Sequence, residues 1–115
     1  MLIINSGFDV ELEGKKFRVD LETADREALA EQLDQIVESL SKVGNITDEA
    51  KLKKELDFLA TMQATALTLI FKDKAKQVLK LVGHETDNFN YTYALKIILG
   101  VINYNEIDDF VQTLN

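Results

Sequence analysis

The stretch Phe58–Phe71 constrains the fold of this chain most, because none of its residues carries a charge. Read as a helix, it presents apolar atoms in every direction, so one helix can pack against two different neighbours. The first apolar face consists of Leu52, Leu56, Leu59, Ala66 and Ile70, and the second of Leu67, Phe71, Ala75, Val78 and Val82. We therefore expect this helix to form the buried centre of the protein.

Alternation of apolar and polar side chains over residues 8–21 predicts a β-hairpin. A type II′ turn at Gly14-Lys15 fits the pattern, because glycine readily adopts the positive φ that this turn requires. The predicted facing pairs are Leu12 with Phe17, Val10 with Val19, Phe8 with Leu21, Glu13 with Lys16, and Glu11 with Arg18. A lone hairpin is marginally stable in water, so its apolar face should lie on the helices. Leu2–Ile4 is a short candidate strand that would pair either with this hairpin or with another chain.

Apolar residues at helical spacing predict four helices after the hairpin, and hence an α+β, predominantly α-helical fold in a single domain, residues 1–115. The helices cover about residues 23–43, 48–82, 91–103 and 106–114, and the second is long and central. In the first, an apolar stripe of Leu29, Leu33, Ile36, Leu40 and Val43 lies opposite an acidic stripe of Glu27, Glu31, Asp34 and Glu38. The acidic stripe is either a solvated surface or a docking surface for a basic partner.

Residues with the chemistry of helix caps stand at the predicted helix ends. Those expected at N-termini are Thr23, Thr47 or Asp48, and Asn105, and those expected at C-termini are Gly44 or Asn45, in the left-handed conformation, and Gly83. The charged segment Lys72–Lys74 is where the second helix would kink, but the continuing apolar pattern favours one helix. Gly100 lowers the helix propensity of the third helix, which suggests either close approach by another helix or a glycine that the helix merely tolerates.

Composition narrows the classes of partner and compartment. Thirteen basic and twenty acidic residues give a net charge of -7, which argues against nucleic acid, because phosphate binding needs clustered Lys and Arg. The uncharged stretch is shorter than the roughly 20 apolar residues that span a bilayer, so we expect no membrane segment. The N-terminus lacks the features of a signal peptide, and the chain has no cysteine. We therefore expect a cytoplasmic protein.

No residue pattern in the chain predicts a catalytic, cofactor or metal site. The only histidine, His84, stands near Glu85 and Asp87, but these three lack the remaining ligands of a zinc site and the glycine of a calcium loop. Asp108-Asp109 is typical of a solvated helix face rather than an acid-base pair. The aromatic residues that would be considered for base stacking, but are better read as packing, are Phe89, Tyr91, Tyr93 and Tyr104. We expect a protein that is not an enzyme.

The order of elements, a β-hairpin, an acidic amphipathic helix, a long central helix and two shorter helices, resembles the small tail assembly chaperones of long-tailed bacteriophages. The segments that carry the resemblance are 71–83, the loop with Asp87 and Asn90, and 93–103. The resemblance implies a non-virion factor that binds the helical tape measure protein and keeps it soluble while tail-tube subunits polymerise. It also implies the short form of a protein that is often made as a longer frameshifted product as well.

The resemblance supplies no catalytic residue, and no motif assigns the residues that bind the partner. Wide apolar helix faces and an acidic exterior are compatible with a soluble chaperone that self-associates into a homo-oligomer in the cytoplasm of a bacterial host. The alternative is a structural connector or adaptor retained in a finished phage or bacterial assembly, where the same faces would form permanent interfaces. A small regulatory binding protein is a third class, without support from particular residues.

Overall fold

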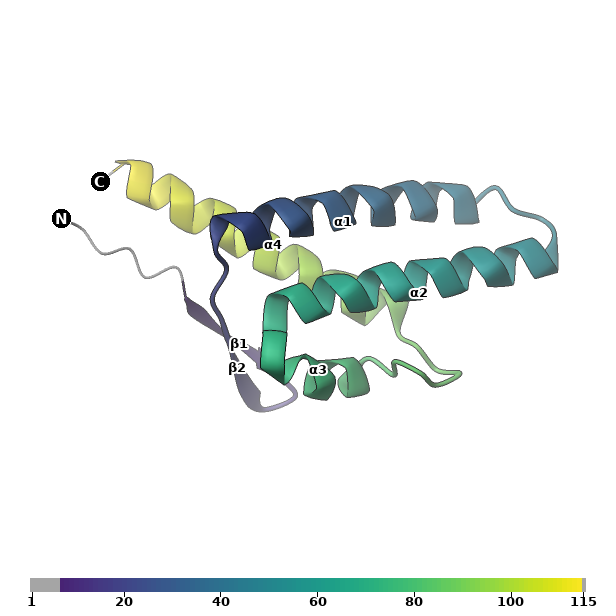
Figure 1. Ribbon diagram of the computed structural model, residues 1–115, viewed down its shortest axis with the longest axis horizontal. Coiled ribbons are helices and arrows are strands. Elements are labelled where there is room, and N and C mark those ends of the chain that lie inside the picture. The colour runs from purple at the N-terminus through teal and green to yellow at the C-terminus, as the bar shows by residue number, and fades with distance from the viewer. Residues whose placement is uncertain (1–6, 115) are drawn as a thin grey trace.

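Helices dominate the structure, a computed structural model that describes the backbone of residues 7–114 and the side chains of residues 7–103 (Figure 1). The fold is α+β and predominantly helical. Its elements are β1 (Phe8–Leu12), β2 (Lys15–Val19), α1 (Thr23–Val43), α2 (Glu49–Phe71), the 3₁₀ turn η1 (Lys72–Lys74), α3 (Ala75–Leu81) and α4 (Tyr91–Leu114). In Figure 1, α1 and α2 form an antiparallel pair, α3 folds back along α2, and α4 crosses behind α2. The hairpin lies where α1 begins and α2 ends.

The β-hairpin is present, but the predicted register is wrong. The observed pairs are Phe8 with Val19, Asp9 with Arg18, Val10 with Phe17, Glu11 with Lys16, and Leu12 with Lys15. The loop is Glu13-Gly14, with φ angles of 50° and 81°, as in a type I′ turn, so it lies one residue earlier than the predicted Gly14-Lys15 turn. Moving the loop by one residue shifts the pairing by two, so the same side chains stay on the core face. Phe8, Leu12, Phe17 and Val19 are buried there.

The first helix has the predicted bounds but different caps. Its N-cap is Glu22 rather than Thr23, and the Glu22 backbone N–H donates to Asp25 Oδ2 at 3.1 Å. Its C-cap, Gly44, has an ordinary helical φ of -64°, so neither Gly44 nor Asn45 closes the helix in the left-handed conformation. The Asn45 side-chain amide instead donates to the Ser41 carbonyl oxygen at 3.2 Å. The C-terminal end of α1 therefore has a side-chain hydrogen bond in place of the expected residue in the left-handed conformation.

The second helix begins as predicted at a cap supplied by Asp48. Its Oδ1 accepts from the backbone N–H groups of Ala50 and Lys51, at 2.9 and 3.1 Å. These contacts satisfy two of the N–H groups that the first turn of a helix leaves without partners. Of the two predicted residues, Asp48 rather than Thr47 is therefore the cap.

The predicted continuous helix over residues 48–82 is wrong, because the chain reverses at Lys72. This residue has a φ of 52°, and α2, η1 and α3 are separate elements. Lys72 Nζ lies 3.1 Å from Asp25 Oδ2 and donates to the Asp20 carbonyl oxygen at 2.9 Å. A straight helix would have extended for about 50 Å. The reversal instead brings Ala75 and Val78 of α3 into the core.

Residues 91–114 form one helix rather than the two that were predicted. Asn90 caps α4, with Oδ1 accepting from the Tyr93 backbone N–H at 2.9 Å. The helix continues through Asn103–Asn105 to Leu114, so Asn105 does not start a new helix. Asparagine inside a helix costs less than 1 kcal/mol relative to alanine, and neither glycine nor proline stands there to break the backbone.

The core forms around α2, as the uncharged stretch predicts. Most residues of the two apolar faces that were predicted for residues 48–82 are buried. They are Leu59, Ala66, Ile70, Leu67, Phe71, Ala75, Val78 and Val82. The Phe17 ring meets the Phe71 ring edge-on, with centroids 5.8 Å apart, which joins β2 to the end of α2. From α4, the core receives Ala94, Ile97, Ile98 and Val101. The hairpin therefore packs on the helices.

The protein is longer than a compact domain of its size. Its extents are 56 × 27 × 19 Å, and its radius of gyration is 15.5 Å, against about 13 Å for a compact domain. The α1–α2 pair extends away from the hairpin, and its outer part carries exposed apolar side chains. In the predicted apolar stripe of α1, Leu29 and Ile36 are buried, whereas Leu40 is 37% exposed. Only part of that stripe therefore joins the core.

We expect Gly83→Ala to destabilise the protein by more than about 1 kcal/mol. Gly83 has a φ of 79°, and a Cβ there would lie 2.6 Å from the Asn88 carbonyl oxygen. The matched control is Gly44→Ala, where φ is helical and the new methyl group would meet the nearest atom, Ser41 O, at 3.8 Å. Urea denaturation of both variants measures the difference. Equal stability losses would contradict the distinct conformations of the two glycines.

We expect Asp25→Asn to cost roughly 0.5–1 kcal/mol of unfolding free energy at neutral pH. The Glu22 N–H, and then the Lys72 ammonium, hold the pKa of Asp25 below its ordinary value. A lowered folded-state pKa means that the contribution is present above the ordinary carboxyl pKa of about 3.9 and is lost as the pH falls through the folded-state pKa.

Denaturation at pH 7 and at successively lower pH, beside the control Asp34→Asn, tests the Asp25 prediction. Asp34→Asn removes the same charge from the exposed acidic stripe. The deficit of Asp25→Asn should shrink as the pH falls below about 4. A deficit that stays constant with pH would contradict the assigned role of the carboxylate.

Candidate partner-binding surfaces

The first candidate surface is the exposed side of α2. It comprises the exposed residues Phe58, Thr61, Thr65 and Thr68, together with the half-buried Leu69, the half-buried Leu79 of α3 and the buried Ala64, which lines a hollow there. We call it the α2 outer face. None of these residues is charged, although charged residues make up 29% of the chain. Phe58 is 55% exposed. The uncharged stretch therefore has two buried sides, as predicted, and a third that remains open to solvent.

Three threonines on the α2 outer face use their hydroxyl groups within the helix. The hydroxyls of Thr61, Thr65 and Thr68 donate to the carbonyl oxygens of Asp57, Thr61 and Ala64, at 3.0, 2.9 and 2.8 Å. Each bond joins a residue to the one four positions earlier in the chain. Covering this face would therefore leave no threonine hydroxyl without a hydrogen-bond partner, which lowers the cost of burial.

One hollow lies on the α2 outer face, and a second borders that face at Phe58. One, of about 360 Å³, lies between α2 and the end of α3 and is lined by Thr61, Ala64, Thr65, Thr68, Leu69, Leu79 and His84. The other, of about 320 Å³, lies toward the tip of the α1–α2 pair and is lined by Ile46, Lys51, Lys54, Glu55 and Phe58. Because Phe58 stands between the tip and the uncharged threonines, the two hollows follow one side of the same helix.

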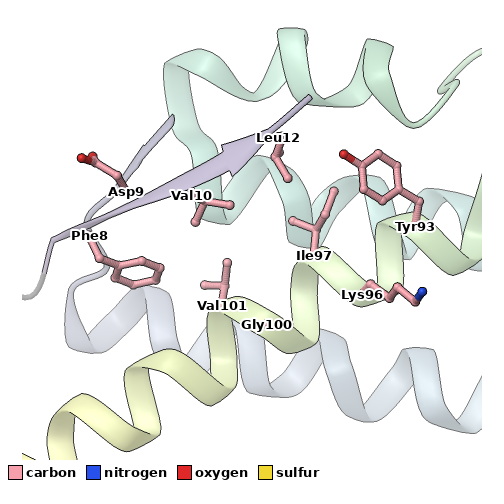
Figure 2. A pocket seen from close by; sticks show the side chains of 9 residues that line it. All are labelled: Phe8, Asp9, Val10, Leu12, Tyr93, Lys96, Ile97, Gly100 and Val101. Atoms are coloured by element: carbon pink, nitrogen blue, oxygen red, sulfur yellow. The ribbon is translucent and has the colours of Figure 1, made fainter. Parts of the chain in front are cut away.

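The second candidate surface is an apolar groove between β1 and α4, which we call the β1–α4 groove (Figure 2). Its volume is about 390 Å³, and its lining residues are Phe8, Asp9, Val10, Leu12, Tyr93, Lys96, Ile97, Gly100 and Val101. Figure 2 shows Val10 and Phe8 pointing from the strand toward α4, where Ile97 and Val101 point back. Apart from the chain neighbours of Gly100 and the surrounding backbone of α4, no described atom lies within 4 Å of the position of a Cβ at this residue. Of the two readings of this glycine, close approach by another helix is therefore not observed among the described residues.

A polar contact inside the core links α2 to the start of α4. Gln63 is fully buried, its Nε2 donates to the Tyr91 carbonyl oxygen at 3.3 Å, and its Oε1 has no hydrogen-bond partner among the described residues. The Tyr91 hydroxyl donates to the Leu56 carbonyl oxygen at 3.2 Å. Burial, and then the charge of Asp57, raise the pKa of Tyr91. Sequence reasoning missed Gln63, although an amide within an uncharged stretch was the available signal.

Of the residues considered for metal or acid-base chemistry whose side chains the structure describes, His84 alone borders one of the hollows or the β1–α4 groove. His84 borders the hollow beside α3, and its Nε2 lies 3.8 Å from Glu85 Oε1. In the part of the chain that the structure describes, no three His, Asp or Glu side chains gather closely enough to hold a metal ion. The side chains of Tyr104 and Asp108-Asp109 lie outside the described residues.

The acidic stripe of α1 faces solvent. Glu27, Glu31, Asp34 and Glu38 are all exposed, and Glu38 pairs with Lys42 at 3.5 Å. This arrangement confirms the predicted division of α1 into an apolar and an acidic side. Exposed acidic residues with surface partners are typical of a solvated helix, so the stripe alone identifies no partner.

In comparisons with known proteins, no family model, no curated protein and no solved structure matched this chain. A search of the described helices for a segment long and apolar enough to cross a membrane found none.

We expect Gln63→Leu to retain the stability of the native chain within about 1 kcal/mol. The substitution keeps the volume of the side chain and removes a buried oxygen that lacks a partner, which offsets the lost bond to Tyr91. Gln63→Ala is the comparison, and it should cost roughly 2 kcal/mol because it leaves a cavity. Urea denaturation measures both. A greater loss for leucine than for alanine would show that the amide itself stabilises the core.

Proposed function

We propose that this chain is a non-enzymatic tail assembly chaperone of a long-tailed bacteriophage, and that it binds the tape measure protein in the cytoplasm of the bacterial host. The resemblance of the sequence suggests the family, although the structure has neither the continuous central helix nor the two separate C-terminal helices of the predicted order. The α2 outer face supports a protein-binding role. The observation that carries the proposal is this uncharged, exposed face on a protein whose net charge is -7.

A helical client fits the α2 outer face in both size and chemistry. From Phe58 to Leu69 the face extends over about 17 Å of helix, which matches about three turns of a partner helix. Helices that bind in a groove contact it through apolar residues at spacings of three and four. The threonine hydroxyls are already bonded inside α2, so an apolar helix can cover them without leaving donors unpaired.

The charged part of the surface suits a chaperone that keeps its client soluble. The acidic stripe of α1 is exposed on a different helix from the proposed client surface. A net charge far from zero keeps proteins apart in solution through mutual repulsion. One helix of the pair would then bind the client while the other supports solubility.

Exposed apolar residues on α1 favour one other function, a connector retained in a finished particle. Val37 is 55% exposed and Leu40 37% exposed, and both lie outside the α2 outer face. Permanent interfaces are more hydrophobic than transient ones, and a second apolar surface would serve a protein with two lasting neighbours. Stoichiometric amounts of the chain in purified virions would support the connector, and its absence from them would support the chaperone.

Co-expression with the tape measure protein of the same genome tests the proposed function. We expect the two proteins to elute together in soluble form. Thr65→Lys should reduce co-elution at least tenfold, because it places a charge at the centre of the uncharged face. The control is Val37→Ser, which changes an exposed apolar residue of α1 and should leave co-elution intact.

Two results would contradict different parts of the proposal. A tape measure protein that stays insoluble and unbound beside the native chain would overturn the chaperone function. Equal co-elution of Thr65→Lys and the native chain would leave the function standing but would overturn the α2 outer face as the binding surface.

A further inference from the structure

We propose that the client of the α2 outer face is an amphipathic helix whose acidic residues are confined to one end, and that their carboxylates contact Lys51 and Lys54 at the tip of the α1–α2 pair. The inference rests on the proposed function and names the chemistry of the client. It follows from the way in which charge is distributed along one side of α2.

Two lysines extend the α2 outer face toward the tip. Lys54 and Lys51 stand four and seven residues before Phe58, and residues at these spacings share one side of a helix. Both are exposed, and together with Ile46, Glu55 and Phe58 they line the hollow of about 320 Å³ at the tip. An exposed aromatic ring and two ammonium groups therefore border the same hollow.

The ammonium groups of Lys51 and Lys54 are available to a partner. Among the side chains that the structure describes, neither group forms an ion pair with a carboxylate. The lining of the tip hollow has these two lysines against one acidic residue, Glu55, whereas the whole chain has a net charge of -7. The hollow is therefore opposite in sign to the rest of the protein, and complementary charge favours an acidic partner there.

The hollow beside α3, at the other end of the α2 outer face, differs in charge. Its lining contains no lysine, arginine, aspartate or glutamate, and His84 is its only titratable residue. Lys72 follows Thr65 by seven residues, but its ammonium group already contacts Asp25 and the Asp20 carbonyl oxygen. A carboxylate buried at this end would lose its hydration without gaining a cation, which is costly.

These two ends define the helix that fits. Its apolar residues, at spacings of three and four, cover the threonines and fill the hollow beside α3, while its carboxylates lie at the tip. From Lys51 to Leu69 this side of α2 extends over about 27 Å, so the bound helix has about five turns and is acidic in a terminal one. A helix with a lysine in that turn would meet like charge, which gives the face its specificity.

Charge reversal at the tip tests the contact. Lys51→Glu with Lys54→Glu is compared with the control Lys53→Glu with Lys96→Glu, which changes the net charge by the same amount. Lys53 lies about 140° around α2 from Phe58, and Lys96 belongs to α4. On co-expression with the tape measure protein of the same genome, we expect the reversed variant to co-elute at least tenfold less than the native chain and the control to match it. Circular dichroism and urea denaturation check that both variants are folded.

Synthetic peptides test the chemistry of the client directly. Peptides of about 18 residues carry leucines at spacings of three and four and glutamines elsewhere, with two glutamates or two lysines in one terminal turn. The charged turn is the first in one pair of peptides and the last in another, so the experiment also determines the direction of the bound helix. In fluorescence anisotropy, we expect an acidic peptide to bind the native chain at least tenfold more tightly than its lysine counterpart. The preference should reverse in the variant Lys51→Glu with Lys54→Glu.

The outcomes separate this inference from the proposed function. Co-elution of the charge-reversed variant at the native level would overturn the contact and leave the chaperone function standing. Equal losses in the reversed and control variants would assign the effect to net charge and would also overturn the contact. A native chain that prefers acidic peptides but leaves the tape measure protein insoluble would support the chemistry of the face and overturn the function. Equal binding of acidic and lysine peptides, or binding of neither, would overturn the inference.

Discussion

The reversal at Lys72 determines how the other elements pack. It turns one long apolar pattern into two helices that lie side by side, so that both faces of the pattern meet the same core. Lys72 Nζ contacts Asp25 at the start of α1 and the Asp20 carbonyl oxygen between β2 and α1. One side chain therefore connects the end of α2 to the junction of the hairpin and α1. The Phe17–Phe71 contact lies next to this reversal and closes the core there.

Periodicity predicted the elements of the fold but not how they connect. The bounds of α1 follow from its apolar and acidic stripes, and the core faces of α2 follow from the absence of charge. The break at Lys72 does not follow, because the apolar spacing continues through Ala75, Val78 and Val82 and a tertiary contact holds the reversal. The continuity of α4 was missed because asparagine weakens a helix without ending it.

The hairpin shows a second limit of pattern reasoning. A shift of the pairing by two residues keeps every side chain on its own face, so alternation cannot distinguish the predicted register from the observed one. The positive φ angles of Glu13 and Gly14 decide between them. The candidate surfaces could not be predicted from the sequence, for a different reason. Whether Phe58 and Thr65 are covered depends on where α1, α3 and α4 come to lie, and on which side of α2 they leave open.

The elongated shape has a consequence for the dynamics of the molecule. The core is concentrated toward the hairpin, while the far part of the α1–α2 pair is held mainly by contacts between two helices. Local opening costs least where few apolar groups are buried, so stability should decrease from the hairpin toward the connection between α1 and α2. A partner that binds near Phe58 would order the least stable part of the protein. The conformational entropy lost in that ordering would offset part of the favourable free energy of binding.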